Sequence, residues 1–127
     1  MAEMGVAPKQ YNFEDGSGLS RLTLLTPATV SKLLAFMYAS KYRDAWISLL
    51  PVSGEDGTLK KRFRESGTGA IHAKTGSLSH VTALSGYMLP TTGKAYSFSI
   101  LVNNFNGPSS EIRTVLDKIA VLVMNGN

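Results

Sequence analysis

Residues 70–102 read AIHAKTGSLSHVTALSGYMLPTTGKAYSFSILV and contain three segments with the character of β-strands, at 70–75, 81–89 and 95–102. The third segment alternates Tyr96, Phe98, Ile100 and Val102 with small residues, as a strand with one buried face does. Residues 90–94, Pro-Thr-Thr-Gly-Lys, are suited to a hairpin connection. The pattern therefore predicts that the last two strands are antiparallel neighbours.

Helical patterns lie on both sides of these strands. Thr26 is a suitable N-cap and Pro27 a suitable first residue for a helix over 27–40, and its buried face would hold Val30, Leu33, Leu34 and Met37. A shorter helix, capped by Asp44 and ended by Pro51, would carry Trp46, Ile47, Leu49 and Leu50. Trp46, Leu49 and Leu50 are expected in the core, in preference to a ligand platform. A final helix, capped by Ser109 or Ser110, would have an apolar face of Ile112, Val115, Leu116, Ile119 and Val123. The order predicts an α+β fold, an antiparallel sheet with flanking helices.

Composition narrows the classes of function. The chain has 127 residues, which suits one domain, and no cysteine, which excludes a disulfide scaffold and a thiol nucleophile. Neither a signal peptide nor a transmembrane segment is predicted. With two histidines, His72 and His80, no metal site or cofactor is expected; we expect His72 on a strand face and His80 in a loop. Residues 1–14 have no clear period and are expected to form an extended lead-in.

Two features are compatible with nucleic-acid binding. The net charge is +4, and a basic run around Phe63 contains Lys60, Lys61, Arg62 and Arg64. The run is short and lacks interleaved aromatic residues, so a solvated helix face over 59–65 is favoured and no nucleic-acid partner is expected. A nucleic-acid-binding domain remains the third alternative.

Two segments have residues suited to chemistry: DGSGLSR at 15–21 and HAKTGS at 72–77. The first is by itself a Gly/Ser turn. In the second, a Lys-Thr-Gly triplet on a strand has a known use in acyl-transfer enzymes that recognise penicillin. There the lysine supplies positive charge, the threonine hydroxyl binds a substrate carboxylate, and the glycine leaves room for substrate. The N–H of Ser77 would be placed to donate to an oxyanion. A strand at the sheet edge could also bind a peptide as an added strand.

The chain resembles the C-terminal part of D-alanyl-D-alanine carboxypeptidase/endopeptidases, the class C low-molecular-mass penicillin-binding proteins. The resemblance rests on these two segments, on the Thr-Pro-Ala-Thr helix start and on the stretch 50–59. The resemblance covers roughly residues 13–123. It implies that residues 15–127 are the C-terminal portion of a serine-type peptidase domain in the cell envelope. Such an enzyme hydrolyses peptidoglycan stem peptides at D-Ala-D-Ala and is acylated by β-lactams.

The resemblance also implies residue roles. Lys74 and Ser77 carry over as catalytic, Lys74 supporting proton transfer and the Ser77 N–H binding the oxyanion. Thr75, Gly76 and Leu78 carry over as substrate-binding residues on the same strand. In the 15–21 loop, Leu19 and Arg21 would line the stem-peptide pocket, with Arg21 facing a carboxylate, while Ser17 and Ser20 would hold the shape of the loop.

Two elements of the family pattern are missing. The family nucleophile lies in Ser-x-x-Lys and is assisted by Ser-x-Asn, and neither pattern occurs at any serine here. Arg21 is also followed by Leu22-Thr23 where the family commonly has x-Asn. The sequence therefore predicts a downstream fragment that is inactive alone, forms no β-lactam adduct, and either associates with the missing N-terminal portion or self-associates. The second alternative is a non-catalytic module that binds a peptide along residues 74–77.

Overall fold

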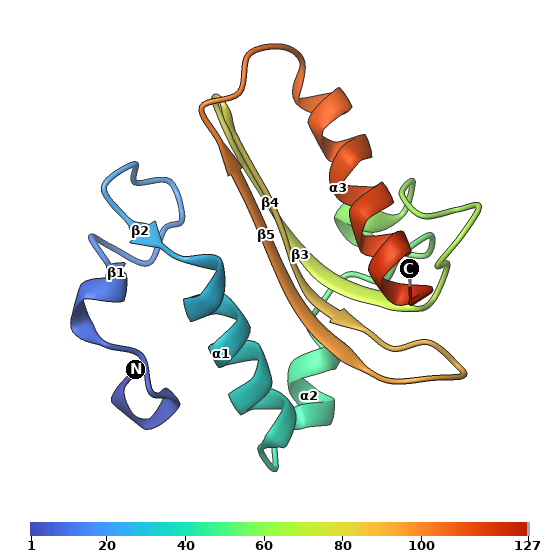
Figure 1. Ribbon diagram of the computed structural model, residues 1–127, viewed down its shortest axis with the longest axis horizontal. Helices are drawn as coiled ribbons and strands as arrows, with labels where there is room; N and C mark the ends of the chain where they lie inside the picture. The colour runs from blue at the N-terminus through green and yellow to red at the C-terminus, as the bar shows by residue number, and fades with distance from the viewer. Residues whose placement is uncertain (127) are drawn as a thin grey trace.

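The computed structural model describes residues 1–126 and has an α+β architecture, as predicted (Figure 1). Its main sheet contains β3 (Ile71–Leu78), β4 (Val81–Met88) and β5 (Tyr96–Asn103), antiparallel and in the order β3-β4-β5. Helices α1 (Pro27–Ala39) and α2 (Arg43–Ser48) lie on one face of this sheet, and α3 (Ser109–Met124) lies on the other. The predicted hairpin between the last two strands is confirmed, and β3 is left at an edge.

Strand β3, which the sequence predicted to end at Thr75, is longer than predicted. It continues to Leu78 because Ser79 and His80 make a two-residue turn, in which His80 has a positive φ of 59°. The turn explains how eight residues of β3 pair with eight of β4 in unbroken register, from Ile71 opposite Met88 to Leu78 opposite Val81. His80 is thus a loop residue, as expected, and Lys74 to Ser77 lie wholly within the strand.

Helix α1 begins as predicted, since the Thr26 hydroxyl accepts a hydrogen bond from the Thr29 N–H at 3.1 Å and Pro27 is the first helical residue. Leu34 is buried on its inner face, and Val30, Leu33 and Met37 are half-buried. The helix therefore packs on the sheet through the predicted face.

Helix α2 differs from the prediction in two details. It starts at Arg43, so Asp44 lies in the first turn and is not the cap. Leu49 follows the helix and is 77% exposed, so its assignment to the core was wrong. Trp46 is half-buried, and its Nε1 donates to the Tyr87 hydroxyl at 3.0 Å. Tyr87 in turn donates to the Leu34 carbonyl at 2.7 Å, which ties both helices to β4, and burial raises the pKa of Tyr87.

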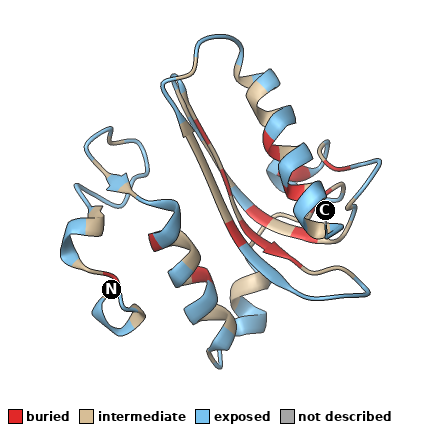
Figure 2. Ribbon diagram, viewed as in Figure 1, coloured by how far each residue is buried: buried red, intermediate tan, exposed pale blue. Residues whose placement is uncertain are grey.

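Helix α3 packs on the sheet through only part of the predicted face, since Ile112 and Leu116 pack on the core and the other three predicted residues do not. Pro108 precedes it, and no serine side chain caps it. Leu116 and Ala120 are fully buried, whereas Val115, Ile119 and Val123 are 42–50% exposed. The helix is apolar over more than one face, and the sheet can cover only the side with Ile112, Leu116 and Ala120. The core beneath it is made of Leu59, Phe63, Ile71, Ala73, Leu84, Met88 and Phe98 (Figure 2).

The N-terminal segment is not a plain extended lead-in. It contains two 3₁₀ turns, η1 (Ala2–Met4) and η2 (Pro8–Gln10), followed by β1 (Tyr11–Asn12), which pairs with β2 (Leu24–Leu25). Val6 is only 4% exposed. The Lys32 ammonium on α1 donates to the Gly5 carbonyl, so the segment packs on its own chain.

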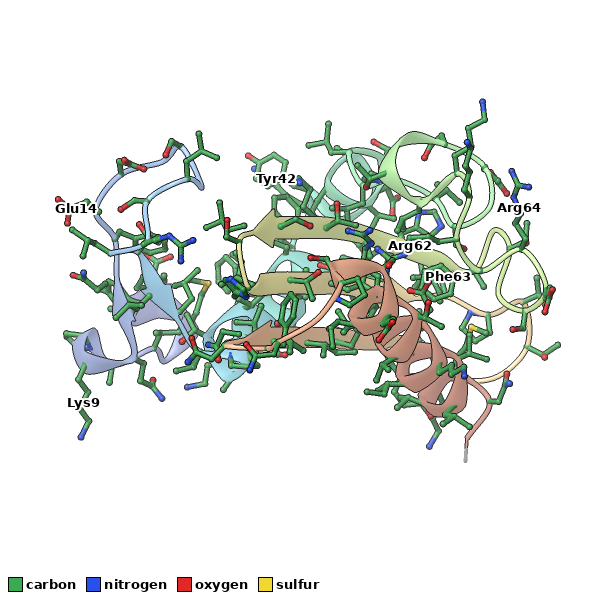
Figure 3. All side chains as sticks on the ribbon, turned by 90° about the horizontal axis from the view of Figure 1, so that it is seen from above. Lys9, Glu14, Tyr42, Arg62, Phe63 and Arg64 are labelled. Carbon is green, nitrogen blue, oxygen red and sulfur yellow. The ribbon has the colours of Figure 1, made fainter. Side chains whose placement is uncertain are left out.

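The basic run is not a solvated helix face. After the 3₁₀ turn η3 (Gly57–Leu59), residues 60–66 form turns and bends, with Phe63 buried at a φ of 61°. Arg62 turns inward to Asp117 on α3, while Arg64 is exposed on the outer side of the loop (Figure 3). Among residues 1–126, no helix is both long enough and apolar enough to cross a membrane.

Candidate functional site

The edge strand β3 is covered along only half of its length. The Ser53 N–H donates to the Ile71 carbonyl at 2.9 Å, and the Ala73 N–H donates to the Pro51 carbonyl at 3.0 Å. The Ser53 hydroxyl is buried; it accepts from the Ile71 N–H and donates to the Gly67 carbonyl. Residues 51–53 therefore strap the first half of the edge.

These bonds also show which backbone groups face outward. The backbone N–H and C=O groups of Ile71 and Ala73 point away from β4. Since these groups alternate along a strand, the backbone groups of Thr75 and Ser77 point away from β4 too. In the described part of the chain no backbone group bonds to either of them on that side. The Thr75 carbonyl accepts from the Lys74 ammonium. The Thr75 N–H and the backbone groups of Ser77 are thus open to an added peptide strand, at the positions where the sequence placed the oxyanion donor and the carboxylate-binding hydroxyl.

Lys74 and Thr75 point to opposite faces of the sheet, as neighbours on a strand must. Lys74 is exposed, and its ammonium donates to the Thr75 carbonyl at 2.7 Å. Thr75 is half-buried, and its hydroxyl donates to the Thr58 hydroxyl at 3.1 Å. The positive charge and the hydroxyl therefore lie on either side of the open backbone edge.

Gly76 has a packing role that the sequence did not reveal. A Cβ at this position would lie 3.3 Å from the Ala83 Cβ on β4, a tight contact. The stronger constraint is at Gly86, where a Cβ would lie 2.1 Å from the His72 carbonyl oxygen. His72 is half-buried on the strand, and its buried Nδ1 has no hydrogen-bond partner in the described part of the chain.

The loop at 15–21 is held by its own side chains. The Asp15 carboxylate accepts from the Ser17 N–H at 2.9 Å and from the Ser17 hydroxyl at 2.7 Å, and these bonds lower the pKa of Asp15. The Ser17 hydroxyl accepts from the Leu19 N–H at 3.0 Å, and the Ser20 hydroxyl accepts from the Leu22 N–H at 3.2 Å. Both hydroxyls are thus engaged within the loop.

One residue of this loop reaches the edge strand's end. The Arg21 guanidinium donates to the Ser79 carbonyl at 3.3 Å, in the turn that follows Leu78. Arg21, Ser79, His80 and Phe105 line a small cavity of about 320 Å³ there. Leu19 is 72% exposed and makes no such contact. The fold therefore brings Arg21 and Leu78 to one end of β3 and leaves Leu19 apart.

Sequence reasoning missed the side chains that surround Thr75 and Ser77. Thr58, Arg62, Thr82 and Arg113 line one cavity of about 310 Å³ with these two residues. They come from the loop after α2, from β4 and from α3, so no local motif joins them. The register of Ser77 opposite Thr82 was the one signal available, and it requires the hairpin turn to be placed correctly. Residues 1–126 contain no group of three His, Asp or Glu that could hold a metal ion.

Known proteins are similar to this chain along most of its length. A family model described as D-Ala-D-Ala carboxypeptidase 3 (S13) matches residues 1–125. The chain is 34% identical to "Penicillin-sensitive carboxypeptidase A" of Dictyostelium discoideum, over 94% of this chain and 24% of that protein. It is 39% identical to a "D-alanyl-D-alanine carboxypeptidase" of Actinomadura sp. (strain R39), over 95% of this chain and 23% of that protein.

A solved structure is also similar. The crystal structure of penicillin binding protein 4 (dacB) from Haemophilus influenzae aligns with a TM-score of 0.74 and 28% identity, over 84% of this chain and 24% of that chain. The chain thus spans about a quarter of the length of the relatives that it matches.

Proposed function

The chain belongs to the D-Ala-D-Ala carboxypeptidase 3 (S13) family, and from this premise we propose that it supplies the substrate-binding edge of a serine D-Ala-D-Ala carboxypeptidase. The observation that carries the proposal is the open half of β3. There the outward backbone groups of Thr75 and Ser77 lie between the Lys74 ammonium and a cavity lined by hydroxyls and guanidinium groups. A peptidoglycan stem peptide would bind along this edge as an added strand.

The roles of the strand residues follow from this placement. In the reaction a serine attacks the penultimate D-Ala carbonyl, the terminal D-Ala leaves, and water releases the acyl group. The Ser77 N–H points out of the sheet and would donate to the oxyanion. The Thr75 hydroxyl would bind the substrate's terminal carboxylate, and the Lys74 charge would support proton transfer. At the far end of β3, Arg21 and Leu78 would border the stem-peptide side chain. Leu19 is exposed on the same loop as Arg21 and would face the bound side chain only after this loop moves.

The attacking serine is proposed to come from outside these 127 residues. No serine in the sequence has the family's Ser-x-x-Lys or Ser-x-Asn spacing. By itself the chain would then bind a peptide without turning it over, as a binding module would, and would not be acylated by penicillin. Acylation by β-lactams and work in the cell envelope are proposed for the complete enzyme.

Two measurements test the proposal. Intact mass after incubation with benzylpenicillin is expected to show no covalent adduct, and a stable adduct would overturn the assignment of the nucleophile. Titration with acetyl-D-Ala-D-Ala, followed by amide NMR, is expected to shift the Thr75 and Ser77 signals. Lys74→Ala and Thr75→Ala are expected to weaken this binding at least about fivefold. Lys94→Ala, which removes an exposed lysine of the β4–β5 hairpin, serves as the control. Binding that survives both strand substitutions would contradict the site.

A further inference from the structure

The cavity beside the open half of β3 carries an excess of positive charge. Its six lining residues are Thr58, Arg62, Thr75, Ser77, Thr82 and Arg113, and it measures about 310 Å³. Two guanidinium groups and four hydroxyls thus surround a space with no carboxylate in its lining. Guanidinium and hydroxyl groups are donors suited to an anion, although in this structure the Thr75 hydroxyl donates to Thr58 and the Thr82 hydroxyl to the Gly76 carbonyl.

The positive charge of Arg62 is already balanced by a carboxylate. Its guanidinium makes a bidentate pair with Asp117 on α3, with Nε 3.1 Å from both carboxylate oxygens, and the two side chains are only 14% and 23% exposed. The pair fixes Arg62 at the side of the cavity. Arg62 therefore contributes shape and hydrogen-bond donors without a free charge.

Within residues 1–126, Arg113 is the cationic residue of this cavity that has no ion-pair partner. It lies on α3 one helical turn before Asp117, on a side of the helix that is half-buried against the sheet. The ion pairs among residues 1–126 join Arg62 to Asp117 and Arg43 to Asp44, and neither includes Arg113. A half-buried guanidinium is stabilised when a carboxylate binds it, so the cavity favours an anionic group from outside.

We infer that Arg113 binds the free C-terminal carboxylate of a peptide lying on the β3 edge, and so makes this site select peptide ends over internal peptide bonds. The inference rests on the proposed function, because it takes the peptide's place from the open edge of Thr75 and Ser77. Both of these side chains face the Arg113 cavity while their backbone groups face the peptide. A carboxylate bound in this cavity would have all three residues in its lining.

The selectivity follows from the cost of leaving Arg113 unpaired. A peptide that continues past this point places a neutral amide near the guanidinium, which then loses water without gaining a counter-charge. A free carboxylate restores the charge balance. The geometry thus favours carboxypeptidase over endopeptidase specificity, and Arg113 is a specificity-determining residue.

The test compares two ligands that differ only at this group, acetyl-D-Ala-D-Ala and its C-terminal amide, each titrated into the 127-residue chain and followed at the Thr75 and Ser77 amide signals. The unsubstituted chain is expected to prefer the acid. Arg113→Gln is expected to weaken acid binding about tenfold and to leave amide binding unchanged. Arg113→Lys, which keeps the charge, is expected to retain part of the preference.

Lys118→Gln is the matched control, since it removes one positive charge from an exposed position of the same helix. It is expected to change binding of the acid by less than about twofold. If both Arg113 variants keep the full preference for the acid, the role of Arg113 is wrong while the peptide site on β3 stands. If neither peptide shifts the Thr75 and Ser77 signals of the unsubstituted chain, the proposed function fails and this inference fails with it.

Discussion

Gly86 lies in the middle of β4, where the neighbouring strand leaves no room for a side chain. A Cβ at this position would lie 2.1 Å from the His72 carbonyl oxygen and 2.6 Å from the Ala73 Cα, both backbone atoms of β3. Gly86→Ala therefore has to displace the edge strand. We expect a loss of at least about 3 kcal/mol in the free energy of unfolding, measured by urea denaturation. Gly16→Ala is the control, because no heavy atom lies within 4 Å of its added Cβ; equal midpoints for the two variants would refute the argument.

Asp117 is the second single residue on which the site depends. Its carboxylate accepts three hydrogen bonds from Nε and Nη2 of Arg62, and Asp117→Asn leaves that half-buried guanidinium without a counter-charge. We expect a destabilisation of about 1–3 kcal/mol, seen as a lower urea midpoint. The same change at Asp44, whose pair with Arg43 is 49% and 87% exposed, is expected to have almost no effect. A loss of similar size at both positions would mean that burial of the Arg62 pair contributes nothing.

Single residues also mark where sequence reasoning stopped. Thr26 and Pro27 predicted the start of α1 correctly because capping is a local property. Arg62 and Phe63 were assigned to a solvated helix because their inward positions depend on Asp117, 55 residues away from Arg62, and on a positive φ at Phe63. Arg113 was missed for the same reason, since nothing near it in the sequence relates it to Thr75.

At the scale of elements, β3 is expected to show an alternating pattern of amide hydrogen exchange. The Thr75 and Ser77 N–H groups point out of the sheet and have no backbone partner in the described part of the chain, whereas those of Lys74 and Gly76 pair with β4. We expect Thr75 and Ser77 to exchange much faster than Lys74 and Gly76. Ile71 and Ala73 are internal controls, because their outward N–H groups bond to Ser53 and Pro51 and should be protected. Uniform protection from residue 71 to 77 would contradict an open edge.

The elements differ in how far the sequence predicted them. The β4–β5 hairpin was predicted because alternation and a turn sequence agree with each other. The end of β3 was placed too early, because Gly76 and Ser77 are poor strand formers that pairing with β4 holds in place. The packed face of α3 was predicted too wide: Leu116 is buried and Val115 is exposed, because both are apolar and only the position of the sheet decides which one it covers.

At the scale of the whole molecule, the relatives are about four times as long as this chain. The chain alone leaves apolar surface uncovered on the outer side of α3. Val115, Ile119, Leu122 and Val123 are 42–52% exposed and follow one another at helical spacing, so they form a continuous stripe. A stripe of this kind is poorly hydrated and is stabilised when another apolar surface covers it.

Self-association through this stripe is the outcome expected of the isolated chain. Sedimentation velocity is expected to show a weight-average mass that rises with concentration above the 13.6 kDa of the monomer. Ile119→Lys places a charge in the centre of the stripe and is expected to shift the chain toward monomer, because burying that charge would cost more than the remaining apolar contacts return. Thr114→Lys adds the same charge at an exposed position of α3 outside the stripe and should leave association unchanged. If the two variants behave alike, net charge and not the apolar stripe controls association. If the unsubstituted chain stays monomeric at every concentration, the stripe is stable in contact with water and needs no partner.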